Sequence, residues 1–133
     1  MKTESKSWQE KYKLSAIGWL RTIFRKKNNV KFNEFNLSAD LLAEIEKAGF
    51  VEASPIQEQT IPLALEGKDV IGQAQTGTGK TAAFGLPTLE KIRTEEATIQ
   101  ALVIAPTREL AVQSQEELFR FGRSKGVKVR SVY

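Results

Sequence analysis

The segment from Ala74 to Thr81 reads AQTGTGKT, and its residue types are those that bind phosphate groups. Glycines at 77 and 79 allow backbone N–H groups to turn toward phosphate oxygens, and a helix N-terminus that follows adds partial positive charge. Lys80 is placed to reach β- and γ-phosphates, and the Thr81 hydroxyl is placed to hold Mg²⁺. The alternative is a Gly-rich turn with a solvated lysine, which the spacing and the strand-to-helix context disfavour.

A second segment, GFVEASPIQ at 49–57, precedes this loop, and an isolated aromatic residue, Phe32, stands seventeen residues before Gly49. The side chains of Ser54 and Gln57 fit a capping box at the start of a helix. A glutamine also offers one acceptor and two donors to a ligand, and the two roles are compatible.

A third segment, PTRELA at 106–111, follows the apolar run ALVIA. Thr107, the opening N–H groups of a helix and the guanidinium of Arg108 together make a phosphate site that needs no base contact. In the simpler interpretation Thr107 is only an N-cap, Glu109 complements the helix dipole and Arg108 is solvated.

Caps and periodicity predict the elements that position these segments. A helix is expected after the N-cap Ser38, ending before Gly49, and a second from Pro55 to about Leu65. Strands and helices then alternate as βαβαβ, which predicts an α/β fold with a parallel sheet and helices on both faces. The expected strands are 70–74, 101–105 and 127–132, and the expected helices are 80 to about 92 and 107 to about 121.

Composition limits the other classes of function. The 133 residues suffice for one domain, and they contain no cysteine and no histidine, which fits a cytoplasmic setting. Residues 1–31 hold nine Lys and Arg against two acidic residues and form a basic, flexible extension with a helical pattern, whereas 32–133 is slightly acidic. No stretch approaches the roughly 20 apolar residues of a membrane-spanning helix, so a soluble protein without membrane contact is expected.

Together the three segments resemble motifs of one family. The form AxTGxGKT, with Ala74 where the general pattern has glycine, resembles DExD/H-box helicases, 49–57 with Phe32 looks like the Q motif, and 106–111 is similar to motif Ia. Residues 32–133 thus resemble the N-terminal part of the first RecA-like domain of a bacterial-type DEAD-box ATP-dependent RNA helicase. One departure is Ala53, where the family usually has proline.

The resemblance implies roles for individual residues. Gln57 would match the N6 amine and N7 acceptor of adenine, and Phe32 would stack on the base, with Phe35 as a competing candidate. The alternative for Phe32 is an ordinary aromatic residue of the core. Lys80 and Thr81 would act in catalysis, and Thr81 would also bind Mg²⁺. The implied ATP-binding residues are Phe32, Gln57, Ala74, Gln75, Thr76, Gly77, Thr78, Gly79, Lys80 and Thr81. The implied RNA-binding residues are Pro106, Thr107, Arg108 and Glu109.

The resemblance also implies parts that these 133 residues do not contain: the DEAD motif, the SAT motif and a second RecA-like domain with arginine fingers. Three hypotheses follow: the N-terminal part of a helicase that couples ATP hydrolysis to RNA duplex unwinding, a catalytically incomplete nucleotide- or RNA-binding module, and a different P-loop NTPase without adenine preference. The strand with the DEAD motif would lie beside the phosphate-loop strand, so the chain alone is expected to be inactive and aggregation-prone. Residues 1–29 are expected to be an upstream addition.

Overall fold

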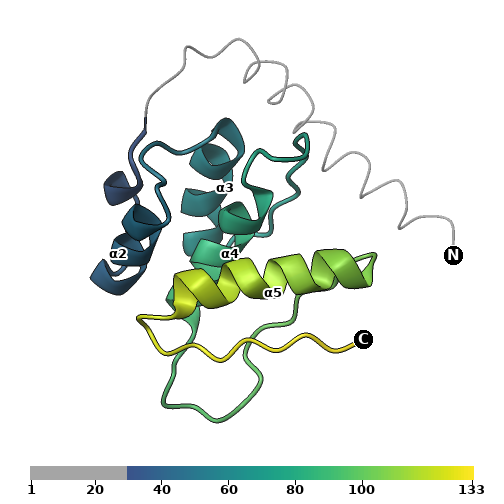
Figure 1. Cartoon of the computed structure of the whole chain (residues 1–133). Coiled ribbons are helices and arrows are strands. Elements are labelled where there is room, and N and C mark those ends of the chain that lie inside the picture. Colours follow the sequence, from purple (N-terminus) through teal and green to yellow (C-terminus); the bar gives the residue numbers. More distant parts are fainter. Residues whose placement is uncertain (1–29) are drawn as a thin grey trace, which may run out of the picture.

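The computed structural model describes residues 30–133, so the predicted basic extension lies almost wholly outside the described residues. A short 3-10 helix, η1, comes first and four α-helices follow (Figure 1). Their bounds are η1 Phe32–Glu34, α2 Ala39–Lys47, α3 Pro55–Leu65, α4 Lys80–Lys91 and α5 Arg108–Gly122. The four predicted helices are confirmed to within about a residue at each end, and η1 was not predicted.

Local signals explain these bounds. Ser38 precedes α2 in extended conformation, and Gly49 follows it at φ +80°, a left-handed conformation that favours glycine. Pro55 opens α3 at a position where its missing N–H costs no hydrogen bond. The hydroxyl of Thr107 accepts from the N–H of Leu110 at 3.3 Å and caps α5.

Helix α4 is the centre of the fold and packs against both α3 and α5 (Figure 1). Its approach to α5 is close at Gly85, because a Cβ added there would overlap Cδ2 of Leu118 and the leucine side chain would have to shift. Half of α4 is buried, which is typical of a helix covered on more than one side. The buried residues of α4 are Ala82, Ala83, Gly85, Leu86, Pro87 and Leu89.

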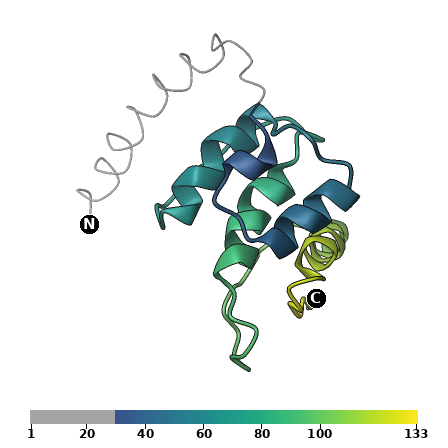
Figure 2. The same ribbon diagram turned by 90° about the vertical axis from the view of Figure 1, so that its left-hand side faces the viewer.

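Aromatic side chains join η1 and the end of α2 to α5. The rings of Phe50 and Phe121 meet edge to face with centroids 5.7 Å apart, and Phe32 packs edge to face on Phe50 at 6.1 Å. Leu41 and Ile45 of α2 are buried in the same cluster. Figure 2 shows α2 beside α5, which is seen nearly end-on in that view.

Polar side chains tie the ends of three helices together. The carboxylate of Glu90, in α4, accepts from the N–H of Ser38 at 2.9 Å, and the ammonium of Lys125 donates to the carbonyl of Leu89 at 2.7 Å. The carboxylate of Glu44, in α2, accepts from the hydroxyl of Ser124 and from Lys47. The hydrogen bond from Lys47 and then that from Ser124 hold the pKa of Glu44 below its usual value. These contacts fix the turn after α5 against α2 and α4.

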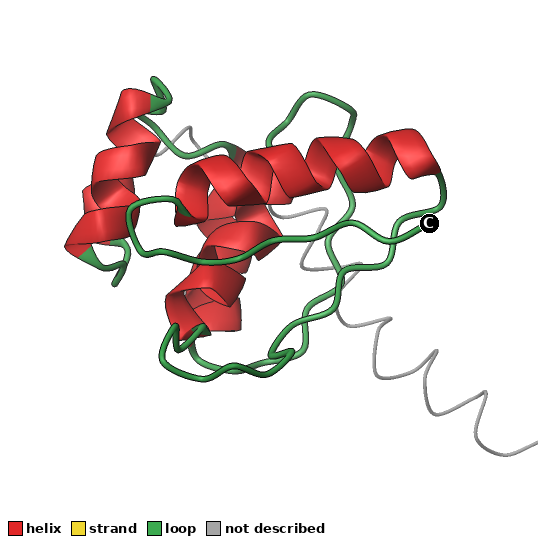
Figure 3. Cartoon of the chain, turned by 60° about the horizontal axis from the view of Figure 1, so that its bottom comes forward, coloured by secondary structure: helices red, strands yellow, loops and turns green. Residues whose placement is uncertain are grey.

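The segments expected as strands stay unpaired within residues 30–133, so no sheet is formed in this part of the chain. Segments 70–74, 101–105 and 127–132 follow extended paths but make no strand ladder, and Figure 3 shows helices and loops only. The one β-bridge of this part of the chain joins Lys31 to Glu52. The apolar pattern predicts an extended backbone, whereas a strand also needs a neighbour about 4.8 Å away to complete its hydrogen bonds.

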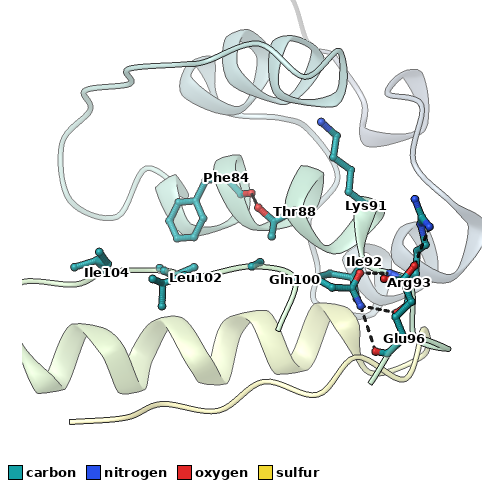
Figure 4. Close-up of a pocket in the computed structure, with 11 residues that line it drawn as sticks. Phe84, Thr88, Lys91, Ile92, Arg93, Glu96, Gln100, Leu102 and Ile104 are labelled. Atoms are coloured by element: carbon teal, nitrogen blue, oxygen red, sulfur yellow. Dashed lines mark hydrogen bonds and ion pairs between the residues drawn. The ribbon is translucent and has the colours of Figure 1, made fainter. Parts of the chain in front are cut away.

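The unpaired segments expose apolar side chains. Leu102 is 80% exposed and Ile104 is 86% exposed. Between this segment and α4 lies a cavity of about 720 Å³, and Figure 4 shows Phe84 and Thr88 of α4 facing Leu102 and Ile104 across it. Monomeric proteins rarely leave a contiguous apolar surface of this kind exposed. In the expected α/β fold a sheet would cover this side of α4.

Candidate functional site

The phosphate-binding segment forms a loop that ends directly in α4. Gly77 has φ +76° and Gly79 has φ +79°, so both glycines occupy the left-handed region that other residues rarely adopt. Gly79 is also the N-cap of α4, which places Lys80 and Thr81 at the first two positions of the helix. The loop therefore lies at the positive end of the α4 dipole, where anions are stabilised.

The side chain of Lys80 turns back over the loop. Its ammonium donates to the carbonyl of Ala74 at 2.7 Å, and the hydroxyl of Thr78 donates to the carbonyl of Gln75 at 2.7 Å. The first bond joins the two ends of the loop, and the second lies within it. The charge of Lys80 consequently lies next to the loop backbone and the start of α4.

Gln57 joins the second motif to the phosphate loop. Its side chain is only 1% exposed, its Oε1 accepts from the N–H of Ser54 at 2.9 Å, and its Nε2 donates to the carbonyl of Gly79 at 3.1 Å. The hydroxyl of Ser54 donates to the carbonyl of Thr78 at 2.7 Å. The predicted contact of Gln57 with the backbone of Ser54 is confirmed, and the same amide holds the loop.

Phe32 lies in the hydrophobic core. It is 4% exposed and its ring meets those of Phe35 and Phe50 edge to face. Phe35, the competing candidate, is also buried in this cluster. The structure therefore brings Gln57 and the phosphate loop together and places both aromatic candidates in the core, and base stacking by either ring stays a prediction.

The third motif lies at the start of α5. Pro106 and Thr107 are exposed ahead of the helix, and Arg108 and Glu109 are exposed in its first turn. The guanidinium carbon of Arg108 lies 4.5 Å from the centroid of the Tyr133 ring. The helix start and the arginine are thus both accessible, as a phosphate site requires.

Two features of these sites were not predicted from the sequence. Ser54 was assigned only as an N-cap, yet its hydroxyl contacts the phosphate loop, and Tyr133 was given no role, yet it lies against Arg108. Both contacts join residues distant in the chain. No local spacing indicates such pairs.

Several known proteins are similar to this chain in sequence. A family model described as DEAD/DEAH box helicase matches residues 54–133. A DEAD-box ATP-dependent RNA helicase, CshA of Streptococcus pneumoniae, is 98% identical over 104 residues, which are 78% of this chain and 20% of that protein. CshA of Bacillus subtilis is 62% identical over 104 residues, 78% of this chain and 21% of the relative. The chain spans about a fifth of the length of these curated relatives.

Solved structures agree with the sequence matches. Dbp5 of Saccharomyces cerevisiae, bound to RNA and ADP–BeF3, is 42% identical with a TM-score of 0.68, over 71% of this chain and 25% of that one. Prp28 of Chaetomium thermophilum, bound to ADP, is 40% identical with a TM-score of 0.71, over 77% of this chain and 26% of that one. The chain thus has the architecture of a partial RecA-like domain, as predicted.

Proposed function

Because this chain belongs to the DEAD/DEAH box helicase family, we propose that it carries the ATP-binding half of the first motor domain of an ATP-dependent RNA helicase. The complete helicase couples ATP hydrolysis to RNA duplex unwinding. The observation that carries the proposal is the hydrogen bond from Gln57 to Gly79, because it joins the base-reading side chain to the phosphate loop. The names of the relatives support both ATP and RNA as ligands.

The phosphate loop binds the triphosphate of ATP in this proposal. The amides around Gly77 and Gly79 face the phosphates, and the ammonium of Lys80 exchanges the carbonyl of Ala74 for phosphate oxygens. The remaining loop residues are expected to contribute backbone contacts: Ala74, Gln75, Thr76 and Thr78. A charged acceptor is the stronger partner for an ammonium, which favours this exchange.

Mg²⁺ fits this loop as a companion of the nucleotide. Within residues 30–133 no group of three potential metal-ligating side chains is found, and no hydrogen bond engages the hydroxyl of Thr81. Mg²⁺ retains waters and phosphate oxygens among its six ligands, so one protein hydroxyl suffices. Thr81 would supply that ligand, and the ion would neutralise charge on the phosphates.

Gln57 selects adenine in this proposal. The amide of its side chain has two N–H donors and two oxygen lone pairs. One donor binds the carbonyl of Gly79 and one lone pair accepts from the N–H of Ser54, which leaves one donor and one acceptor. This pair matches the N7 acceptor and N6 amine of adenine and fails to match guanine. Because the side chain is almost fully buried, the base gains access only when neighbouring residues move.

The start of α5 contacts the RNA sugar-phosphate backbone in this proposal. The free N–H groups of the helix start, together with the guanidinium of Arg108, attract a phosphate without reading a base. Pro106 and Thr107 set the direction of the helix. Glu109 complements the helix dipole and limits how near a phosphate approaches on its own side.

The second candidate is a nucleotide- or RNA-binding module without hydrolysis. Phosphoryl transfer depends on charges positioned around Mg²⁺, whereas binding alone needs only the phosphate loop and the start of α5. RNA-stimulated release of phosphate from ATP by the intact protein separates the two candidates.

A cytoplasmic location stays a prediction. The helices of residues 30–133 include none with the length and apolar character of a membrane span.

Competition for a fluorescent ATP analogue tests the proposal. ATP is expected to displace the analogue from the intact protein, whereas GTP is expected to compete far more weakly. Lys80→Ala should abolish analogue binding, and the matched control Lys68→Ala, an exposed lysine paired with Glu66, should retain it. Equal competition by ATP and GTP, or binding that survives Lys80→Ala, would refute the proposal.

A further inference from the structure

The segment after α5 turns back and runs along that helix with alternating side chains. Val127 is buried and Val129 packs against the core, whereas Lys128 and Arg130 are exposed. The backbone N–H and the hydroxyl of Ser131 both donate to Oε1 of Gln115 on α5, the former at 3.2 Å. Every second residue therefore faces α5.

The next residue on this face, Tyr133, lies at the start of α5. Its ring is beneath the guanidinium of Arg108, 4.5 Å from the carbon to the ring centroid. This distance is within the range in which an arginine is attracted to an aromatic face. Ser131 and Gln115 fix the backbone only two residues earlier, so the ring is held from the core outward.

Arg108 has no other fixed partner in the described part of the chain. No ion pair of residues 30–133 includes it, although Glu109 and Glu116 line the same groove of about 450 Å³. A guanidinium over a ring keeps its N–H donors in its own plane, directed away from the ring. The donors are therefore available to a ligand while the orientation of the side chain is restricted.

The two acidic side chains make this orientation important. A phosphate that enters the groove is repelled by Glu109 and Glu116 and attracted by Arg108. An unrestrained Arg108 on an exposed helix start samples many rotamers. A ring that holds the guanidinium in place removes these alternatives before RNA arrives.

We propose that Tyr133 is a positioning residue that holds Arg108 for contact with a backbone phosphate of RNA. This inference rests on the proposed function, because it requires that Arg108 contacts RNA. Tyr133 itself touches the arginine and not the RNA. The effect of Tyr133 on RNA affinity is therefore independent of the base sequence and requires Arg108.

Single-stranded RNA binding by the intact protein, measured by fluorescence anisotropy over a range of salt concentrations, tests the inference. Tyr133→Leu is expected to weaken binding about two- to fivefold, and Tyr133→Phe to retain it, because the ring alone attracts the guanidinium. Arg108→Ala should weaken binding further and reduce the slope of log K against log salt by about 0.7, the value for one phosphate contact. ATP binding should be unchanged in all variants, which shows that they fold.

The double variant Arg108→Ala/Tyr133→Leu decides between outcomes. Positioning predicts that it binds RNA as weakly as Arg108→Ala and no more weakly, equally for uridine and adenosine homopolymers. An additional loss, or a loss that depends on the base, shows that Tyr133 contacts RNA directly and overturns the inference. If Arg108→Ala weakens binding and Tyr133→Leu does not, only the positioning role fails. If Arg108→Ala has no effect, the RNA site of the proposed function fails with it.

Discussion

The side-chain amide of Gln57 donates a hydrogen bond to the backbone carbonyl of Gly79, 22 residues later in the chain, at 3.1 Å. Gly79 is both the last residue of the phosphate loop and the N-cap of α4. One buried amide therefore connects the start of α3, the loop and the start of α4. A change at any of the three is expected to alter the others.

Replacing Gln57 tests this connection. Gln57→Ala leaves the N–H of Ser54 and the carbonyl of Gly79 without their partner, and a buried polar group that loses its partner costs about 1–3 kcal/mol. We expect a lower free energy of unfolding and weaker ATP binding together. Denaturant titration and nucleotide titration measure the two effects. Gln59→Ala, an exposed glutamine of the same helix, is the control and should change neither.

Substituting alanine for Gly77 and for Gly79 separates the cost of a left-handed backbone from the cost of a steric clash. Both glycines have positive φ, so each substitution costs about 1–2 kcal/mol for a left-handed alanine. At Gly77 the added Cβ meets open space, but at Gly79 it would lie 2.2 Å from Nε2 of Gln57. Gly79→Ala should therefore reduce the unfolding free energy more than Gly77→Ala does. Equal losses in thermal or denaturant unfolding would contradict the contact.

Ionisation of Glu44 predicts a pH dependence of stability. Its folded pKa is lowered, first by the hydrogen bond from Lys47 and then by that from Ser124. In the unfolded chain this carboxyl has a pKa of about 4.3, so the stabilisation is complete above that pH and is lost as the pH falls through the lower folded pKa. Denaturant midpoints measured at falling pH should decline less steeply for Glu44→Gln than for the unchanged protein. Glu46→Gln, on the exposed side of α2, should reproduce the unchanged profile.

The exposed apolar segment 101–105 predicts self-association of the 133-residue chain. Unpaired backbone groups and the side chains of Leu102 and Ile104 form a surface to which another extended segment can add. Ile104→Lys should decrease the apparent mass in size-exclusion chromatography with light scattering. Val51→Lys, at an exposed apolar residue outside the segment, should not. A monodisperse monomer of the unchanged chain would disprove this expectation.

The sequence predicted those parts of the molecule that local signals determine. Pro55 and Thr107 act within one turn of their own helices, so their effects are encoded in short windows, and the loop with Gly77 and Gly79 is similarly local. Ser38 stands at the start of α2 as predicted, but its side chain makes no capping hydrogen bond. The burial of Phe32 was only the alternative interpretation, because an aromatic residue in a short segment gives the same pattern whether it packs in a core or against a ligand. Within residues 30–133 the expected strands are not paired, because pairing depends on neighbours distant in the sequence.

The bond between Lys80 and the carbonyl of Ala74 has a consequence for ligand selection. The long side chain of a lysine loses considerable rotamer freedom when it is fixed, and here it is fixed within the protein itself. An incoming anion therefore meets a preorganised ammonium and only exchanges one acceptor for another. Because a neutral acceptor gains little from that exchange, the loop discriminates by the charge of its ligand more than by shape.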